Sequence, residues 1–477
     1  AMTSGVSLHL DLELQLHVPT DTAGLIAKLE QITSRRVEEI RSIVEQIADP
    51  ELYEVEAARL DKFEDDCFGS IKESNLATEW TELILSRMFS LFTTSEAREV
   101  LVHGYVDLQN GCFNATTEKF DSNTKPTKTI PTSNVLVSGV VDHFKLANPS
   151  SPTDLSLLQD INDYIEYEYR DTINGSRIID LSKFFENVPG LLKDSGFEIV
   201  TTDVKTRSFN RIPVQKSVLE AAKFQTFYYR KFLELLSQKE QPHDFAYTCL
   251  LQNAANREID VDKPINYTTI VNLLRKFPNL LYRDFVKLAN GEPIGFAPYD
   301  TFVEQNDYDD YRIHEFLVNY EFDDIVSVLD TKPTENIVHE LNSSDNFNYA
   351  DLLTPELLKA WKTPPTLRYF AARGAQFYQL CSGIIGDETT VEYHNSKTSR
   401  CFHINRYKYN QTDLDTQLNQ ACTFWNGSRD PQYVSDLNKC KHCDFNSKCL
   451  IPNHQAPQDF HRRQIGSKIY SFLSLVD

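Results

Sequence analysis

The chain lacks the features that mark membrane proteins, secreted disulfide proteins and several enzyme classes. None of its apolar runs approaches the roughly 20 residues that a transmembrane helix needs. Its nine cysteines are an odd number without regular spacing, and no charged-then-apolar leader precedes them, which favours an intracellular, reducing compartment. There is no P-loop, no Gly-x-Ser-x-Gly elbow and no His-Glu-x-x-His helix. We therefore expect no ATPase activity and neither a serine hydrolase nor a metalloprotease of those types.

Positive charge is scarce, because 48 Lys and Arg stand against 69 Asp and Glu and give a net charge of −21. This balance argues against a protein that coats nucleic acid non-specifically, since phosphate binding depends on clustered Lys and Arg. The charge is unevenly distributed, however. Residues 203–231 contain seven basic and two acidic side chains, whereas residues 300–330 contain ten acidic side chains and one Arg. We expect one surface that accepts phosphate and another that repels it.

Three segments favour β-structure, and a long helix follows them. The segments are residues 101–107, 134–142 and 198–206, which carry β-branched residues or border turn-like ones. Pro213 is predicted to open a helix that runs to about Gln238, because proline is well tolerated in a first helical turn.

The strongest functional signal is the order of charged residues on these strands. Asp142 ends the second predicted strand, and Asp203 and Lys205 lie two apart on the third. Their side chains therefore share a face, while Val204 faces the other side. If Asp142 meets Asp203 across the sheet, two carboxylates form an oxygen-rich site that suits Mg²⁺ and activates water for phosphodiester hydrolysis. An isolated Asp-x-Lys is usually a solvated surface pair, so the ordered set carries the prediction of a nuclease.

The following helix adds two polar side chains to the set. Gln225 and Tyr229 fall on a stripe with apolar residues at three- and four-residue spacing. A Gln in such a stripe needs a polar partner. Ordinary core hydrogen bonds are the alternative interpretation of both residues.

Together these motifs resemble the exonuclease V family, a RecB-like group of PD-(D/E)XK nucleases. The likeness covers about residues 5–450 apart from an insertion. It rests on residues 103–107, 138–142, 202–213, 225, 228–231 and 425–429, and on three cysteines near the C-terminus. The resemblance implies a single-stranded DNA exonuclease that takes Mg²⁺, or Mn²⁺, and carries a [4Fe-4S] cluster.

Individual roles are also implied by this resemblance. Asp142 and Asp203 would ligate the metal together with the backbone carbonyl of Val204. Lys205 would position or polarise the attacking water. Gln225 and Tyr229, the remaining two catalytic candidates, would brace the site and the strand.

Three further residues are candidates for DNA or metal contacts. Arg207 and Arg211 are the expected DNA-binding residues, because a guanidinium group suits bidentate phosphate geometry. His9 resembles a metal-site histidine of the family, although a histidine near a chain start is often simply exposed.

Cys440, Cys443 and Cys449 supply three thiolates within ten residues, which is metal-ligand spacing. By resemblance they hold the [4Fe-4S] cluster. Zn²⁺, with His442 or His454 as fourth ligand, and unmetallated thiols are the alternatives.

The fourth cluster ligand is not identified in this sequence. In the family it lies far upstream, so it is either missing with the N-terminus or replaced by Cys67 or another cysteine. The remaining cysteines are expected to be buried small hydrophobes. They are Cys112, Cys249, Cys381, Cys401 and Cys422.

The expected fold class is α/β, a PD-(D/E)XK (restriction-endonuclease-like) nuclease core with a mixed central sheet, a helical N-terminal arch and a helical insertion. The expected divisions are a helical region (1–100), the nuclease core (101–240), a mostly helical acidic insertion (241–365), and the completion of the core with the cysteine cluster (366–477).

The expected activity is end-dependent hydrolysis of single-stranded DNA, 5′-to-3′ by resemblance, in DNA replication or repair and mitochondrial genome maintenance. A passage for one strand needs aromatic residues that stack on bases, and the candidates are Phe209, Tyr228, Tyr407 and Tyr409. The alternatives are an inactive nuclease-fold module that binds DNA or a helicase, and a nuclease that acts on RNA.

We expect a monomer that does not bind membranes, with a single-strand-binding protein or a helicase as candidate partner. Localisation is mitochondrial by resemblance, with the nucleus as the alternative. Residues 1–5 read like a remnant of cloning, so the native N-terminus is expected to be absent.

Overall fold

The computed structural model describes residues 2–17, 20–114, 134–173, 175–238, 245–306 and 361–429. Contacts divide the chain into two compact units, residues 1–419 and 420–477. The sheet and the helices that surround it belong to the first unit.

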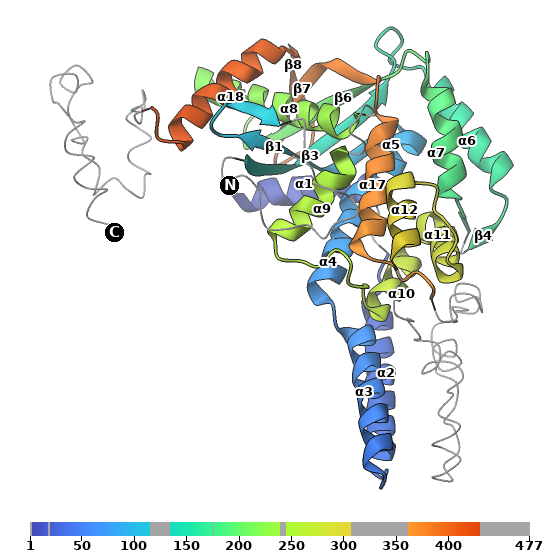
Figure 1. Ribbon diagram of the computed structural model, residues 1–477. Coiled ribbons are helices and arrows are strands. Elements are labelled where there is room, and N and C mark those ends of the chain that lie inside the picture. Colours follow the sequence, from blue (N-terminus) through green and yellow to red (C-terminus); the bar gives the residue numbers. More distant parts are fainter. Residues whose placement is uncertain are drawn as a thin grey trace, which may run out of the picture. The chain divides into compact units, whose positions relative to one another are not determined.

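A six-stranded sheet organises this unit (Figure 1). Its strand order is β2-β1-β3-β6-β7-β8. β6 and β7 are parallel and all other neighbours are antiparallel, so the sheet is mixed, as predicted. The strands are β1 (Glu96–Asp107), β2 (Cys112–Asn114), β3 (Asn134–Ala147), β6 (Glu198–Arg207), β7 (Ile385–Asn395) and β8 (Cys401–Lys408), with β4 (Thr172–Ile173) and β5 (Ser176–Arg177) in a separate ribbon.

Helices account for most of the remaining described chain. They are α1 (Met2–Leu16), α2 (Ala23–Val44), α3 (Pro50–Phe68), α4 (Ile71–Trp80), the π-helix η1 (Thr81–Ser86), α5 (Arg87–Thr94), α6 (Ser156–Glu168), α7 (Leu181–Leu192), α8 (Lys216–Leu236), α9 (Phe245–Asn256), α10 (Tyr267–Lys276), α11 (Pro278–Asn290), α12 (Ala297–Gln305), α17 (Leu367–Leu380) and α18 (Gln411–Trp425).

Two predicted boundaries are wrong. The second predicted strand does not end at Asp142, because β3 continues to pair with β1 as far as Lys145 and with β6 as far as Ala147. The long helix does not open at Pro213: the first helical hydrogen bonds are accepted by the carbonyl of Gln215, and α8 begins at Lys216. Residues 208–215 instead connect β6 to α8, and the segment from Arg207, the last residue of β6, to Pro213 is hereafter called the loop of residues 207–213.

The two faces of the central strands are covered by different helices. Val204 of β6 packs against Leu8 and Leu12 of α1. Val391 and Tyr393 of β7 face the other way and pack against α8. Since Asp203 pairs with Val391 in register, and side chains alternate along a strand, Asp203 and Lys205 lie on the α8 face. The alternation predicted for residues 203–205 is therefore confirmed.

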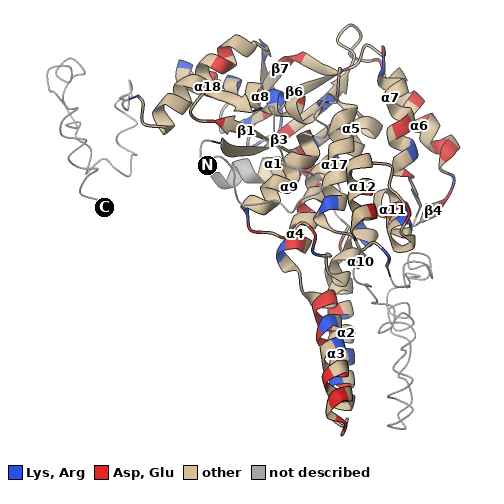
Figure 2. Ribbon diagram, viewed as in Figure 1, with Lys and Arg blue, Asp and Glu red and all other residues tan. Residues whose placement is uncertain are grey.

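The helices α2 and α3 lie side by side and form their own apolar cluster, which includes Val37, Ile40, Leu60 and Phe63. Figure 2 shows acidic and basic residues interspersed along both helices. The pair thus buries one stripe of each helix and exposes a mixed-charge surface.

Within the predicted insertion, α9 to α12 are helical, as expected, and residues 307–360 lie outside the described chain. The described part is anchored to α17 by a fully buried ion pair. Arg373 donates two hydrogen bonds of 2.6 Å to the Asp284 carboxylate, and Tyr369 donates a third of 2.8 Å. Removing one partner of a buried pair of this kind destabilises the fold by about 3 to 5 kcal/mol.

Among the described helices, none is long and apolar enough to span a bilayer.

Candidate active site

Two carboxyl groups, one buried and one half-buried, lie beside one another on adjacent strands. His143 of β3 pairs with Thr202 of β6, so the next residues along the strands, Asp142 and Asp203, are neighbours. Asp142 Oδ2 accepts a hydrogen bond of 2.6 Å from the backbone N–H of Val204. This bond ties the first carboxylate to the strand that carries the second.

One oxygen of this carboxyl pair has no hydrogen-bond donor among the described residues. Asp203 has an exposed fraction of 0%, and its Oδ2 atom has no hydrogen-bond partner among the described residues. Burial, and then the neighbouring Asp203 carboxylate, raise the pKa of Asp142 to about 7. Burial also raises the pKa of Asp203, against the effect of Lys205. An acceptor oxygen buried without a donor, beside a second carboxylate, fits a bound divalent cation.

Lys205 lies on the same side of the sheet as Asp203. A chain of hydrogen bonds holds it there, running from Asp203 through Lys205 and Gln225 to Tyr229. Its Nζ atom lies 2.8 Å from Asp203 Oδ1 and donates a bond of 3.0 Å to Gln225 Oε1. Gln225 Nε2 in turn donates a bond of 2.8 Å to the Tyr229 hydroxyl oxygen. The Gln on the predicted stripe of α8 thus has its polar partner, and the structure brings all five predicted catalytic residues together.

His9 of α1 reaches the same site from the other side of the strands. Its Nδ1 atom lies 3.6 Å from Glu99 Oε1 and 3.9 Å from Asp142 Oδ1. Hydrogen bonding to Glu99 is the largest cause that raises the pKa of His9. His9, Glu99 and Asp142 form a group of side chains whose geometry could hold a metal ion.

Glu99 is the site residue that sequence reasoning missed. It lies opposite Asp142, between the register pairs Arg98–His143 and Val100–Val141. Its φ of 54° is in the left-handed region that non-glycine residues rarely adopt. A single Glu within a strand gives no signal of this kind, because only the register between β1 and β3 brings it to Asp142.

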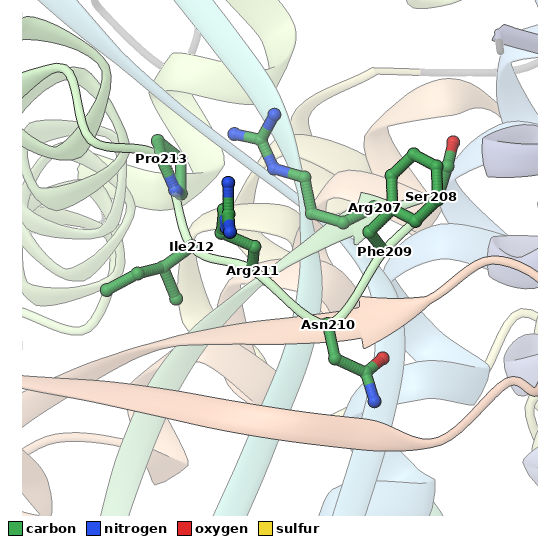
Figure 3. Close-up of a pocket in the computed structure, with 7 residues that line it drawn as sticks. All are labelled: Arg207, Ser208, Phe209, Asn210, Arg211, Ile212 and Pro213. Atoms are coloured by element: carbon green, nitrogen blue, oxygen red, sulfur yellow. The ribbon is translucent and has the colours of Figure 1, made fainter.

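Beyond Lys205, β6 runs into a loop that lines a pocket of about 680 Å³. Figure 3 shows the side chains of Arg207 and Arg211 on one side of this loop and Asn210 on the opposite side. Phe209 is 74% exposed. The pocket therefore combines two guanidinium groups with an exposed aromatic ring.

The β7–β8 hairpin supports this loop. Asn395 Nδ2 donates a bond of 2.6 Å to Asn210 Oδ1, and Ser396 N–H donates one of 2.8 Å to the Arg207 carbonyl. Lys397 Nζ lies 5.7 Å from the centroid of the Phe209 ring. The other three aromatic candidates are half-buried, and Tyr228 and Tyr409 are already engaged by Gln417 and Arg230.

The cysteine predictions have a mixed outcome. Cys440, Cys443 and Cys449 lie outside the described residues. Cys67 lies in the apolar cluster of α2 and α3, where burial raises the pKa of its thiol well above the ordinary value, which favours a core role over a ligand role. Cys249, Cys381 and Cys422 are buried as expected, but the same prediction is wrong for two cysteines that border turns, Cys112 and Cys401, which are exposed.

Comparison with known proteins gives the family of the chain. The sequence profile of a family described as "Exonuclease V - a 5' deoxyribonuclease" matches residues 53–450. A protein of Scheffersomyces stipitis named "Exonuclease V, mitochondrial" is 44% identical over 99% of this chain and 81% of its own length. Proteins with the same name from Debaryomyces hansenii and Candida tropicalis are 38% and 40% identical, over 99% and 100% of this chain and 73% of their own lengths.

The expectation of a DNA-hydrolysing enzyme is thereby confirmed, and the names of these relatives support the expected mitochondrial localisation. Because the profile spans most of the chain and the relatives cover nearly all of it, the chain belongs to the exonuclease V family.

Proposed function

We propose that the protein is a metal-dependent exonuclease of the PD-(D/E)XK fold that degrades single-stranded DNA from a 5′ end in mitochondria. The observation that carries the proposal is that Asp142 and Lys205 both lie beside the buried Asp203 carboxylate on the α8 face of the mixed sheet. A purely structural descendant of a nuclease would gain nothing from two adjacent buried carboxylates, because their mutual repulsion destabilises the fold.

Asp142 and Asp203 are the proposed metal ligands, with the Val204 carbonyl and His9 as further candidates. Mg²⁺ is the proposed ion, with Mn²⁺ as a substitute, because the donor set is mostly oxygen. When bound, the ion supplies charge neutralisation at the phosphodiester and a water of lowered pKa.

The remaining roles follow from what each side chain contacts. The Lys205 ammonium is oriented by Asp203 and Gln225, so it can hold the attacking water or the phosphate in a fixed position. Tyr229 fixes the Gln225 amide. Glu99 orients His9.

The loop of residues 207–213 is the proposed guide for the DNA strand. Arg207 and Arg211 would contact phosphates, and the exposed Phe209 ring would stack on a base without regard to sequence. This arrangement favours single strands, because bases in a duplex are already stacked and paired.

Several finer features remain proposals from the family resemblance. They are a [4Fe-4S] cluster on Cys440, Cys443 and Cys449, a monomeric state, a helicase or single-strand-binding partner, and the four-part division of the chain. The pairing of β7 with β6, and of β8 with β7, supports a core that residues 366–477 complete.

The test uses internally labelled single strands of one sequence as linear DNA, circular DNA, linear DNA with a blocked 5′ end, and RNA. We expect Mg²⁺-dependent cleavage of unblocked linear DNA alone. Cleavage of the circle would remove end dependence, and equal digestion of RNA would favour the RNA-directed alternative. No cleavage by folded protein with its metals bound would favour the inactive binding module.

A further inference from the structure

A second group of metal-binding side chains lies at the start of the β7–β8 hairpin. Glu392 and His394 lie two apart on β7, and Cys401 is paired with His394 across the hairpin. One carboxylate oxygen, one ring nitrogen and the thiol sulfur of these residues all lie within 4.8 Å of one another. Glu392 is in register with Val204, whose side chain contacts α1, so the group lies on the face of the sheet opposite to that of Lys205.

The imidazole of His394 is buried beside the Glu392 carboxylate. His394 is only 6% exposed, and its Nε2 atom lies 2.9 Å from Glu392 Oε2. Its Nδ1 atom is buried with no hydrogen-bond partner among the described residues. Because Nε2 lies so close to the carboxylate, a metal ion bound by both groups would replace this hydrogen bond, and the ring proton would then lie on Nδ1.

The spacing and chemistry of the group fit one class of cation. Two atoms bound to one tetrahedral zinc ion lie roughly 3.3 to 3.8 Å apart, given metal–ligand distances of about 2.0 to 2.3 Å. Atoms that lie within 4.8 Å of one another need to approach by about 1 Å at most to reach this range. A thiolate and an imidazole select Zn²⁺ over Mg²⁺, which prefers oxygen ligands alone.

We propose that Glu392, His394 and Cys401 form a second metal site, separate from the Asp142–Asp203 pair, that binds Zn²⁺ or a similar thiolate-preferring cation. The ion cross-links β7 to β8 at the residues that flank the hairpin turn. That turn holds the loop of residues 207–213 through the Asn395–Asn210 and Ser396–Arg207 hydrogen bonds. The site therefore stabilises the support of this loop and takes no part in hydrolysis.

The test measures the alkylation rate of each cysteine by mass spectrometry of its peptides, in the full-length protein with excess Mg²⁺, with and without Zn²⁺. We expect Zn²⁺ to slow alkylation of Cys401 at least tenfold. Cys112 is the internal control, since it is also exposed and belongs to no metal-binding group among the described residues. An unchanged rate at Cys401, or equal slowing at Cys112, would overturn the proposal.

Two variants identify the ligands. His394→Gln should abolish the protection of Cys401, and protection retained in folded H394Q contradicts the assignment. Because His394 is buried, a second variant guards against misfolding. Cys401 is exposed, so Cys401→Ser should fold normally. The absorption of a Co²⁺-substituted sample should then lose a thiolate-to-cobalt charge-transfer band relative to the wild type, and identical spectra would refute the site.

Discussion

Gln225 Oε1 accepts a hydrogen bond of 3.0 Å from Lys205 Nζ, and this bond joins α8 to the strand that carries the candidate catalytic residues. The Gln225 amide cannot turn freely, because its Nε2 atom donates to the Tyr229 hydroxyl oxygen. The lysine is thereby fixed from two sides, by Asp203 on its own strand and by Gln225 on the helix.

Gln225→Leu should reduce kcat by about 10- to 100-fold, the range seen when a supporting partner of a site residue is removed. KM should change little, because Gln225 lies behind Lys205 and not on the DNA-binding loop. Steady-state kinetics on a single-stranded oligonucleotide provide the measurement. Tyr229→Phe is the matched control with a smaller expected loss, since it removes only the acceptor that orients Gln225. A Q225L enzyme with wild-type kcat would exclude the proposed positioning of Lys205.

Asp142→Asn should stabilise the metal-free protein at pH 8 while removing its response to Mg²⁺. The pKa of Asp142 is raised in the folded state to about 7. Its contribution to stability is therefore present below the unfolded pKa and is lost as pH rises through about 7. The Asn oxygen can still accept the Val204 hydrogen bond, so the substitution removes the charge and keeps the contact.

Thermal melts with and without Mg²⁺ check this prediction. Mg²⁺ at 100 times its Kd should stabilise the wild type by about 2.7 kcal/mol. The same stabilisation in D142N would mean that Mg²⁺ binds elsewhere.

Glu99→Gly and Glu99→Ala should lose activity equally but differ in stability. Both remove the carboxylate beside His9. At a φ of 54°, however, alanine keeps a steric cost of about 1 kcal/mol that glycine does not have. Urea denaturation should therefore rank E99G above E99A, whereas in ordinary strand geometry glycine would be the less stable variant. The reverse order would show that the backbone at this position is not left-handed.

Phe209→Ala should weaken single-stranded DNA binding by roughly 1 to 3 kcal/mol, with similar losses for different sequences, because stacking on an aromatic ring tolerates any base. Arg211→Gln should instead reduce the slope of log K against log salt by about 0.7, the value for one phosphate contact on a single strand. Titrations at several salt concentrations distinguish the two effects. Arg59→Gln on α3 is the control substitution, expected to change neither quantity. Wild-type binding by F209A would remove the loop from the proposed DNA path.

The strand that carries the candidate catalytic residues can be predicted from the sequence because the pattern that marks it lies within a few consecutive residues. A spacing of two residues places Asp203 and Lys205 on one face in any strand, and the following helix carries Gln225 at the spacing of its own buried stripe. The mixed sheet and the helical N-terminal region also follow from such local patterns.

What sequence reasoning missed depends on register between distant segments. Glu99 enters the site only because β1 pairs with β3 at one particular offset. His394 and Cys401 meet only through the β7–β8 pairing, so Cys401 was predicted as a buried hydrophobe when it is exposed. The predicted start of α8 is also wrong, because proline fits both the first turn of a helix and the loop that precedes a helix.

The most direct test of the central claim combines hydrolysis with metal binding in Asp203→Asn. Mn²⁺ binding followed by electron paramagnetic resonance, and digestion of end-labelled linear single strands, are measured on the same samples. Glu198→Gln, on the same strand, is the matched control. The account predicts that D203N folds, loses the tight Mn²⁺ site and cleaves at least about 1,000-fold more slowly, while E198Q behaves as wild type. Wild-type cleavage by D203N would contradict the claim that these paired carboxylates hold the catalytic metal.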